Sequence, residues 1–144
     1  MLTPFAIAPK TGDILLGGII SLEPKQAKDL IEPKVLDLLG SSRDHGNGYE
    51  WLALQKLSFG GQPAGLSLCF YNGQLQQATW SIQLPGARVE DNWPTQEAIE
   101  AEVTFVKKTL SEEMGLFVGQ QAWGEIWSVF DQKGFIASNG LKYQ

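Results

Sequence analysis

The segment Ala122–Gly134 contains the residue types best suited to chemistry in this chain. Glu125 lies between Trp123 and Trp127, and Asp131 follows Glu125 by six residues. Paired carboxylates hydrolyse glycosides when their carboxyl groups stand about 5 to 9.5 Å apart. On an extended strand, at about 3.3 Å per residue, Glu125 and Asp131 would be separated by roughly 20 Å. These two residues therefore cannot form such a pair by themselves.

If the segment is a strand, its side chains alternate between two faces. Trp123, Glu125 and Trp127 then share one face, while Gly124 and Ser128 occupy the other and permit close packing. Tryptophan is enriched at binding hot spots and stacks on sugars and cations. Two interpretations follow. The indoles form an aromatic rim around Glu125, or they pack under loops as part of the core.

Other catalytic and metal-binding patterns are scarce. The single histidine, His45, lies in a glycine-rich polar stretch and is interpreted as a solvated loop residue. The single cysteine, Cys69, lies in an apolar run and is expected to be a buried, inert thiol. Phosphate-loop, EF-hand and zinc-ligand spacings are missing. We predict no catalytic residue, metal site or cofactor. The alternative is a small carbohydrate-active or hydrolytic enzyme that uses Glu125 and a second carboxylate, such as Glu50 or Asp91.

Composition and charge restrict the partners of this chain. With 43% apolar and 19% charged residues, the 144-residue chain is globular. Sixteen acidic and eleven basic side chains give a net charge of −5, and no Lys/Arg cluster offers a nucleic-acid surface. A basic protein is a better partner, because opposite charges steer association. The apolar stretch Ile14–Leu22 is too short to span a membrane, and no secretion signal is evident. We therefore expect a cytoplasmic protein.

The elements that must position the candidate residues are mostly short strands. The expected strands are Pro4–Ala8, Asp13–Ile20, Tyr49–Phe59, Leu66–Tyr71, Gln74–Leu84, Ala122–Phe130, Phe135–Ala137 and Leu141–Tyr143. Pro24 begins a short helical pattern with Ala27, Leu30 and Ile31 on one face, and Pro33 predicts a break. Ser41–Gly48 has the composition of a polar loop.

Asn72-Gly73, between two apolar runs, predicts a tight β-hairpin, because a type I′ turn needs positive φ at both positions. This turn would place Leu68 opposite Gln77, and the apolar faces of the two strands would then be out of phase. Either both faces of the sheet are covered, or a bulge near Gln76–Gln77 restores the phase. We favour the bulge.

Pro94–Met114 is the strongest helical pattern in the chain. Its apolar residues recur every three or four positions and form one stripe, consisting of Ile99, Val103, Val106, Leu110 and Met114. Such a helix must cover a sheet to bury this stripe. We predict a single α+β domain over residues 1–144. It consists of an antiparallel sheet of hairpins, one long amphipathic helix packed on one face, and a short helical segment near the N-terminus.

The chain resembles two kinds of known protein. The strand–Asn-Gly–strand unit, the helix that follows Trp-Pro and the closing Trp-Gly-Glu-Ile-Trp-Ser-Val-Phe-Asp-Gln-Lys-Gly segment resemble small, uncharacterised bacterial α+β proteins. In size and acidity the chain is also similar to the immunity proteins that neutralise secreted toxins. This second resemblance implies a protein-binding role and transfers no residue.

These observations predict a non-enzymatic protein-binding module of the immunity or inhibitor type. The candidate contact groups are Trp123, Glu125 and Trp127, and then the acidic stretch Glu90–Asp91 with Trp93. The expected partner is another protein with a basic surface, rather than nucleic acid or a membrane. A homodimer through a sheet edge or an aromatic patch is a further alternative.

Overall fold

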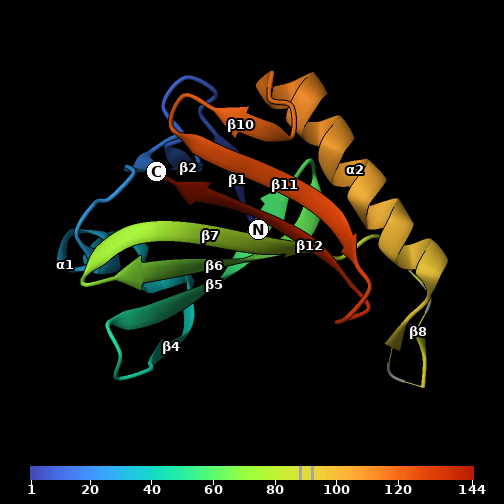
Figure 1. The fold of residues 1–144 in the computed structure, drawn as a ribbon, viewed down its shortest axis with the longest axis horizontal. Helices are drawn as coiled ribbons and strands as arrows, with labels where there is room; N and C mark the ends of the chain where they lie inside the picture. The colour runs from blue at the N-terminus through green and yellow to red at the C-terminus, as the bar shows by residue number, and fades with distance from the viewer. Residues whose placement is uncertain (88, 92) are drawn as a thin grey trace.

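The computed structural model describes residues 1–87, 89–91 and 93–144, which form an α+β fold (Figure 1). The strands are β1 (Thr3–Ile7), β2 (Ile14–Leu16), β3 (Ile20–Leu22), β4 (Leu39–Asp44), β5 (Tyr49–Phe59), β6 (Gln62–Tyr71), β7 (Gln74–Ile82), β8 (Val89–Glu90), β9 (Trp93–Pro94), β10 (Gly119–Gln121), β11 (Gly124–Asp131) and β12 (Ile136–Tyr143). The helical segments are α1 (Lys28–Ile31), the 3-10 helix η1 (Glu32–Leu38) and α2 (Gln96–Met114). This arrangement confirms the predicted fold class.

Most strands belong to one large sheet with the order β10-β11-β12-β7-β6-β5-β1-β2-β3. Its neighbours are antiparallel except β1 and β5, which are parallel where Thr3 and Pro4 meet Leu57 and Ser58. A register shift between Leu54 and Leu57 divides β5. Before this shift β5 pairs with β4, and after it β5 pairs with β1. One strand therefore joins two branches of the sheet.

The β6–β7 hairpin confirms both predictions made for it. Asn72 and Gly73 have φ of 50° and 78°, as the tight turn requires. Cys69 faces Gln77 while the next residue, Phe70, faces Leu75, so Gln76 is an extra residue in β7. This bulge restores the phase, and the apolar residues of both strands point to one side.

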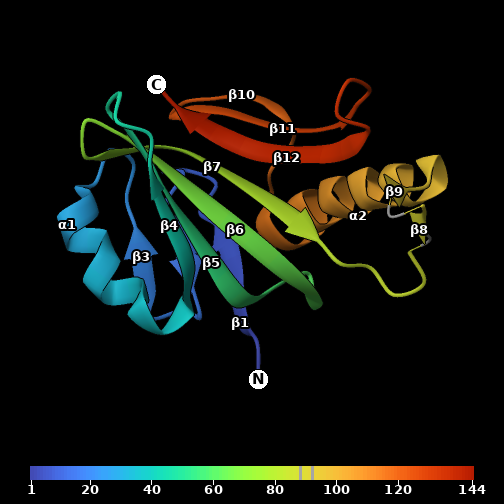
Figure 2. The ribbon, with the colours of Figure 1, turned by 90° about the horizontal axis from the view of Figure 1, so that it is seen from below.

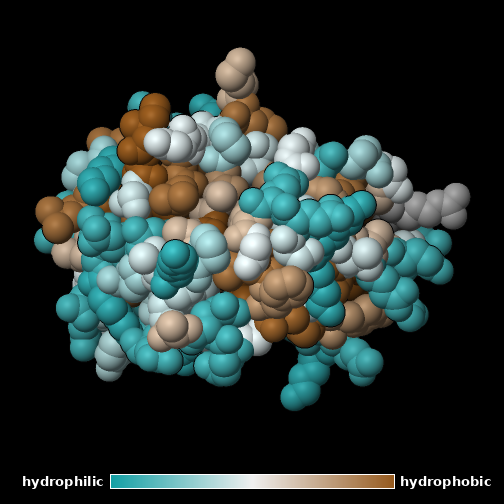
Figure 3. Space-filling view, turned by 90° about the horizontal axis from the view of Figure 1, so that it is seen from above, coloured by the Kyte–Doolittle hydropathy of each residue, from teal (hydrophilic) through white to brown (hydrophobic). Residues whose placement is uncertain are grey.

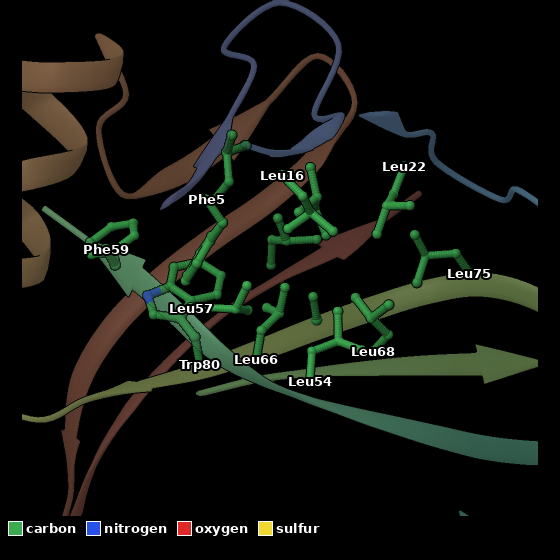
Figure 4. Close-up of a cluster of buried hydrophobic side chains, with 14 of the residues drawn as sticks. Phe5, Leu16, Leu22, Leu54, Leu57, Phe59, Leu66, Leu68, Leu75 and Trp80 are labelled. Atoms are coloured by element: carbon green, nitrogen blue, oxygen red, sulfur yellow. The ribbon is translucent and has the colours of Figure 1, made fainter. Parts of the chain in front are cut away.

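A hydrophobic core fills the space between β1–β3 and the inner face of β5–β7 (Figure 4). Figure 4 labels the side chains that meet there: Phe5, Leu16, Leu22, Leu54, Leu57, Phe59, Leu66, Leu68, Leu75 and Trp80. The ring centroids of Phe5 and Phe59 lie 5.0 Å apart, and each lies 5.9 Å from that of Trp80. The first three strands thus cover the sheet that follows them. Cys69 is also buried, as expected, and burial raises the pKa of its thiol.

Helix α2 packs against β11 and β12, at the opposite end of the molecule from α1 (Figure 2). Thr95 caps its N-terminus, since the Thr95 hydroxyl accepts a hydrogen bond of 3.2 Å from the backbone N–H of Ala98. Gly115 ends the helix in the left-handed region, with φ of 67°. Ile99, Val106 and Leu110 of the predicted stripe are buried. No helix in the described part of the chain is both long and apolar enough to cross a membrane.

Several element predictions were wrong. Ser41–Gly48 is not all loop, because its first residues continue β4 along the edge of the sheet. Asp13–Ile20 is not one strand, because a glycine turn separates β2 from β3. The two last predicted strands form one continuous strand, β12. Leu30 is exposed rather than packed, because the α-helix lasts only four residues before Pro33 and the 3-10 segment change the periodicity.

Candidate protein-binding site

The alternation predicted for β11 is present in the structure. Gly124, Ile126 and Ser128 are buried on the inner side, and Glu125 and Val129 are exposed on the outer side. The strand begins at Gly124, so Trp123 precedes it and does not follow the alternation. Trp123 and Trp127, which the sequence pattern placed on one face, therefore lie in different environments.

Trp123 links the last strands of the chain to the first ones. Its indole N–H donates a hydrogen bond of 3.0 Å to the carbonyl oxygen of Pro9. The ring lies over Gly12, where a Cβ would approach within 2.5 Å of the indole. Its centroid is 5.8 Å from that of the buried Tyr143, whose hydroxyl donates a 2.6 Å hydrogen bond to the Gly12 carbonyl oxygen. Trp123 therefore has structural partners on several sides.

Trp127 is half-buried and lies across the neighbouring strand β12. Its ring covers Gly140, at a position where no Cβ would fit. Its indole N–H donates a 3.0 Å hydrogen bond to the Ser138 hydroxyl. The two indoles thus contact different neighbours, and the structure does not bring them together as one rim around Glu125. The outer part of Trp127 remains accessible beside Glu125 and Val129.

Glu125 lies on the outer face, opposite Lys142 of β12. It lines a shallow hollow of about 220 Å³, and the described residues that share this hollow include no second Asp or Glu side chain. Glu50 lies on β5, and three strands stand between β5 and β11. At about 4.8 Å per strand, this order separates Glu50 from Glu125 by roughly 19 Å. Neither the lining of this hollow nor Glu50 therefore supplies a second carboxylate at glycosidase distance from Glu125.

Glu50 and Asp131 have other partners in the structure. Glu50 accepts a 2.7 Å hydrogen bond from the Lys28 ammonium group, and this interaction raises the pKa of Lys28. Asp131 accepts backbone N–H bonds of 3.1 and 3.3 Å from Lys133 and Gly134, and so shapes the turn between β11 and β12. Both carboxylates therefore support local structure.

The second candidate group forms the β8–β9 hairpin, which we call the acidic hairpin and define by Val89, Glu90, Asp91 and Trp93. It lies at the N-terminal end of α2, apart from the large sheet (Figures 1 and 2). Glu90 faces Trp93 across the hairpin, and Asp91 adopts φ of 49° in the turn. The Trp93 side chain is 59% exposed, and Val89 is 62% exposed. The structure brings these charges and the indole together on one projection.

Two features of this end of the molecule were not among the predicted contact groups. Val89 adds an exposed apolar side chain to the acidic hairpin. Glu97 and Glu100 are exposed and extend its negative charge along the first turns of α2, and their position soon after Trp-Pro was the available sequence signal. Among the residues with a described placement, no three His, Cys, Asp or Glu side chains gather into a metal-binding group.

A polar cluster ties α2 to the sheet behind β11. The buried Asn139 amide donates to the Trp80 carbonyl oxygen at 3.1 Å and to the Glu102 carboxylate at 2.8 Å. The Asn139 side-chain oxygen accepts a 2.6 Å hydrogen bond from Ser128. Burial raises the pKa of Glu102, although hydrogen bonds from the Ile82 N–H and from Asn139 oppose this effect. The Asn139 amide of β12 therefore stabilises the ionised carboxylate of Glu102 on α2.

This raised pKa predicts how stability depends on pH. Between the ordinary glutamate value of about 4.5 and its higher native value, the folded protein binds more protons at Glu102 than the unfolded chain does. The contribution of Glu102 to stability is therefore greatest below pH 4.5 and falls as pH rises through that window. Urea unfolding of wild type and Glu102→Gln at several pH values measures this contribution. We expect wild type to lose stability relative to the variant as pH rises; a constant difference would contradict the assignment.

Comparisons with known proteins give one informative match. No protein-family model matches the chain, and no curated protein matches it by sequence. A chain of the solved structure described as "Rhs1-CT in complex with cognate immunity protein RhsI1" is similar in fold, with a TM-score of 0.54 and 11% sequence identity. The similarity covers 99% of this chain and 88% of that chain. At this level of identity, the similarity concerns the fold.

Proposed function

We propose that this chain is a non-enzymatic, protein-binding module of the immunity type, which neutralises a bacterial toxin domain by binding it in the cytoplasm. The observation that carries the proposal is the fold similarity, over nearly the whole of both chains, to a chain from a complex with an immunity protein. The net charge of −5 supports a partner with a basic surface. Fold similarity alone does not transfer function, so the proposal also depends on the surface described above.

We place the centre of the binding surface on the acidic hairpin. Trp93 is the most exposed tryptophan in the described residues, and tryptophan is enriched at the hot spots of protein interfaces. Glu90 and Asp91 beside it supply charges for a basic partner. Glu125 and Trp127 on β11 form a second, smaller contact region. Trp123 contributes less in this proposal, because its N–H and ring already contact Pro9, Gly12 and Tyr143.

The test uses as its probe a toxin domain encoded beside this chain, which the proposal expects to exist. We expect tight binding by calorimetry and rescue of growth when the two are co-expressed. Trp93→Ala should weaken binding by about 2 kcal/mol, or roughly 30-fold in Kd. Phe117→Ala is the matched control, because Phe117 is an equally conspicuous exposed aromatic residue outside the hairpin, with 72% exposure.

The two possible failures of this experiment have different meanings. Absence of both binding and growth rescue would reject the immunity role. Binding that is unchanged in Trp93→Ala and in Glu90→Lys/Asp91→Lys would keep the role and exclude the acidic hairpin as its surface. Circular dichroism of each variant checks that the fold is retained.

A further inference from the structure

A second surface, at the end of the molecule that carries the N-terminus, exposes apolar side chains. We call it the apolar end and define it by Leu2, Ile19 and the hollow that they line. Ile19 is 92% exposed and Leu2 is 40% exposed. Hydrophobic atoms gather at the upper left in Figure 3, on the side to which the N-terminus projects in Figure 2. Clustered exposure of this kind marks interaction sites in water-soluble proteins.

The fold presents Ile19 in a fixed position. Ile19 lies in the turn with Gly17 and Gly18, whose φ values of 62° and 71° let β2 reverse directly into β3. The N–H of Ile19 bonds to the Leu16 carbonyl oxygen at 3.2 Å, and that of Gly17 bonds to the Pro4 carbonyl oxygen at 2.8 Å. These bonds hold the turn against β1. An apolar side chain on a preorganised turn loses little conformational entropy when a partner covers it.

A hollow of about 460 Å³ lies next to Ile19. Its lining is largely apolar and includes Leu2, Leu16, Ile20 and Leu38. Lys34 and Asp37 of η1 stand at its rim, and both are exposed. Neither forms an ion pair with any other described residue. The same surface therefore offers an apolar projection, an apolar hollow, one cation and one anion.

From this arrangement we infer that the apolar end binds a second copy of this chain. In a twofold-symmetric dimer, the same surface of both copies meets. If one residue contacts a second residue of the other copy, the reverse contact also forms, so the surface must be complementary to itself. Ile19 of each copy enters the hollow of the other, and Lys34 of each copy pairs with Asp37 of the other. A surface with one charge of each sign suits a second copy better than the basic partner expected at the acidic hairpin. This inference does not rest on the proposed function.

Light scattering after size-exclusion chromatography of the full chain, over a range of concentrations, tests the inference. We expect a concentration-dependent dimer. Ile19→Asp should raise the dimer dissociation constant at least roughly tenfold. Phe117→Asp places the same charge on an exposed apolar position away from the apolar end, and should leave the dissociation constant unchanged.

Charge exchange provides the sharper test. Lys34→Asp alone and Asp37→Lys alone each place like charges opposite one another, and each should weaken the dimer. The double variant restores opposite charges in both pairs and should recover most of the wild-type affinity. A monomeric wild type, a dimer insensitive to Ile19→Asp, or a double variant weaker than both single variants would overturn the inference. Loss of toxin binding in Ile19→Asp with a monomeric wild type would assign the apolar end to the other protein instead.

Discussion

Replacing Asn139 by leucine is expected to reduce the free energy of unfolding by about 3 kcal/mol, because it leaves buried polar groups without partners. The substitution removes the hydrogen bonds to Glu102, Ser128 and the Trp80 carbonyl oxygen. Glu102 would lose the amide that stabilises its ionised form, so its pKa should rise further. The destabilisation should therefore be larger at pH 7 than at pH 4. Urea unfolding at both pH values measures this difference.

A double-mutant cycle separates this effect from simple loss of packing. Glu102→Leu removes the carboxylate that depends on Asn139, so the double variant Asn139→Leu/Glu102→Leu should cost less than the two single changes combined. Strict additivity of the two changes, or a cost that does not vary with pH, would show that the amide and the carboxylate do not act together.

Replacing Gly124 by alanine is expected to cost about 3 kcal/mol, because strand β12 occupies the space that a side chain would need. A Cβ at this position would overlap the carbonyl oxygen of Lys142, which is backbone and cannot rotate away. The φ of 156° also lies in a range that residues with a side chain rarely adopt, so both the backbone conformation and the close approach of the two strands explain the glycine. Thermal or urea unfolding of Gly124→Ala measures the loss.

Gly65→Ala is the matched control for this change. Gly65 also lies in a strand of the sheet, but a Cβ there would lie 3.6 Å from the Ser81 hydroxyl oxygen, an ordinary contact. We expect its effect to stay within about 0.5 kcal/mol. If Gly124→Ala were as mild as Gly65→Ala, β11 and β12 would be less tightly paired than the structure indicates.

The pattern of apolar residues along the sequence correctly predicted those strands and helices that bury one face. β5 has the bounds expected from its sequence, and the phase conflict across Asn72-Gly73 correctly predicted the bulge at Gln76. Helix α2 also follows its apolar stripe, beginning two residues later than expected because Thr95 serves as its cap. In each case the periodicity of the sequence matches a face that the structure buries.

The features that could not be predicted from the sequence depend on backbone pairing or on partners far away in the chain, and neither leaves a pattern in the local sequence. β4 is a polar edge strand held by backbone hydrogen bonds to β5, so its side chains show no strand pattern. Trp123 owes its position to Pro9, which is 114 residues away, and Glu102 to Asn139, which is 37 residues away. Whether an indole is anchored or accessible is decided by such partners. The sequence therefore identified Trp93, Trp123 and Trp127 as candidate contact residues, but it could not show which of them are accessible to a partner.

The contacts that join the two ends of the chain also determine when the protein can complete its fold during synthesis. The Gly12 carbonyl oxygen receives its hydrogen bond from Tyr143, a residue 131 positions later. While the ribosome still holds the last strand, the β1–β2 hairpin lacks the tyrosine and tryptophan that cover it. Domains usually fold as whole units once their residues have emerged, and topologies dominated by distant contacts fold slowly. Within this fold, β1 and β2 are thus made before the other strands but are among the last to be fully protected from solvent.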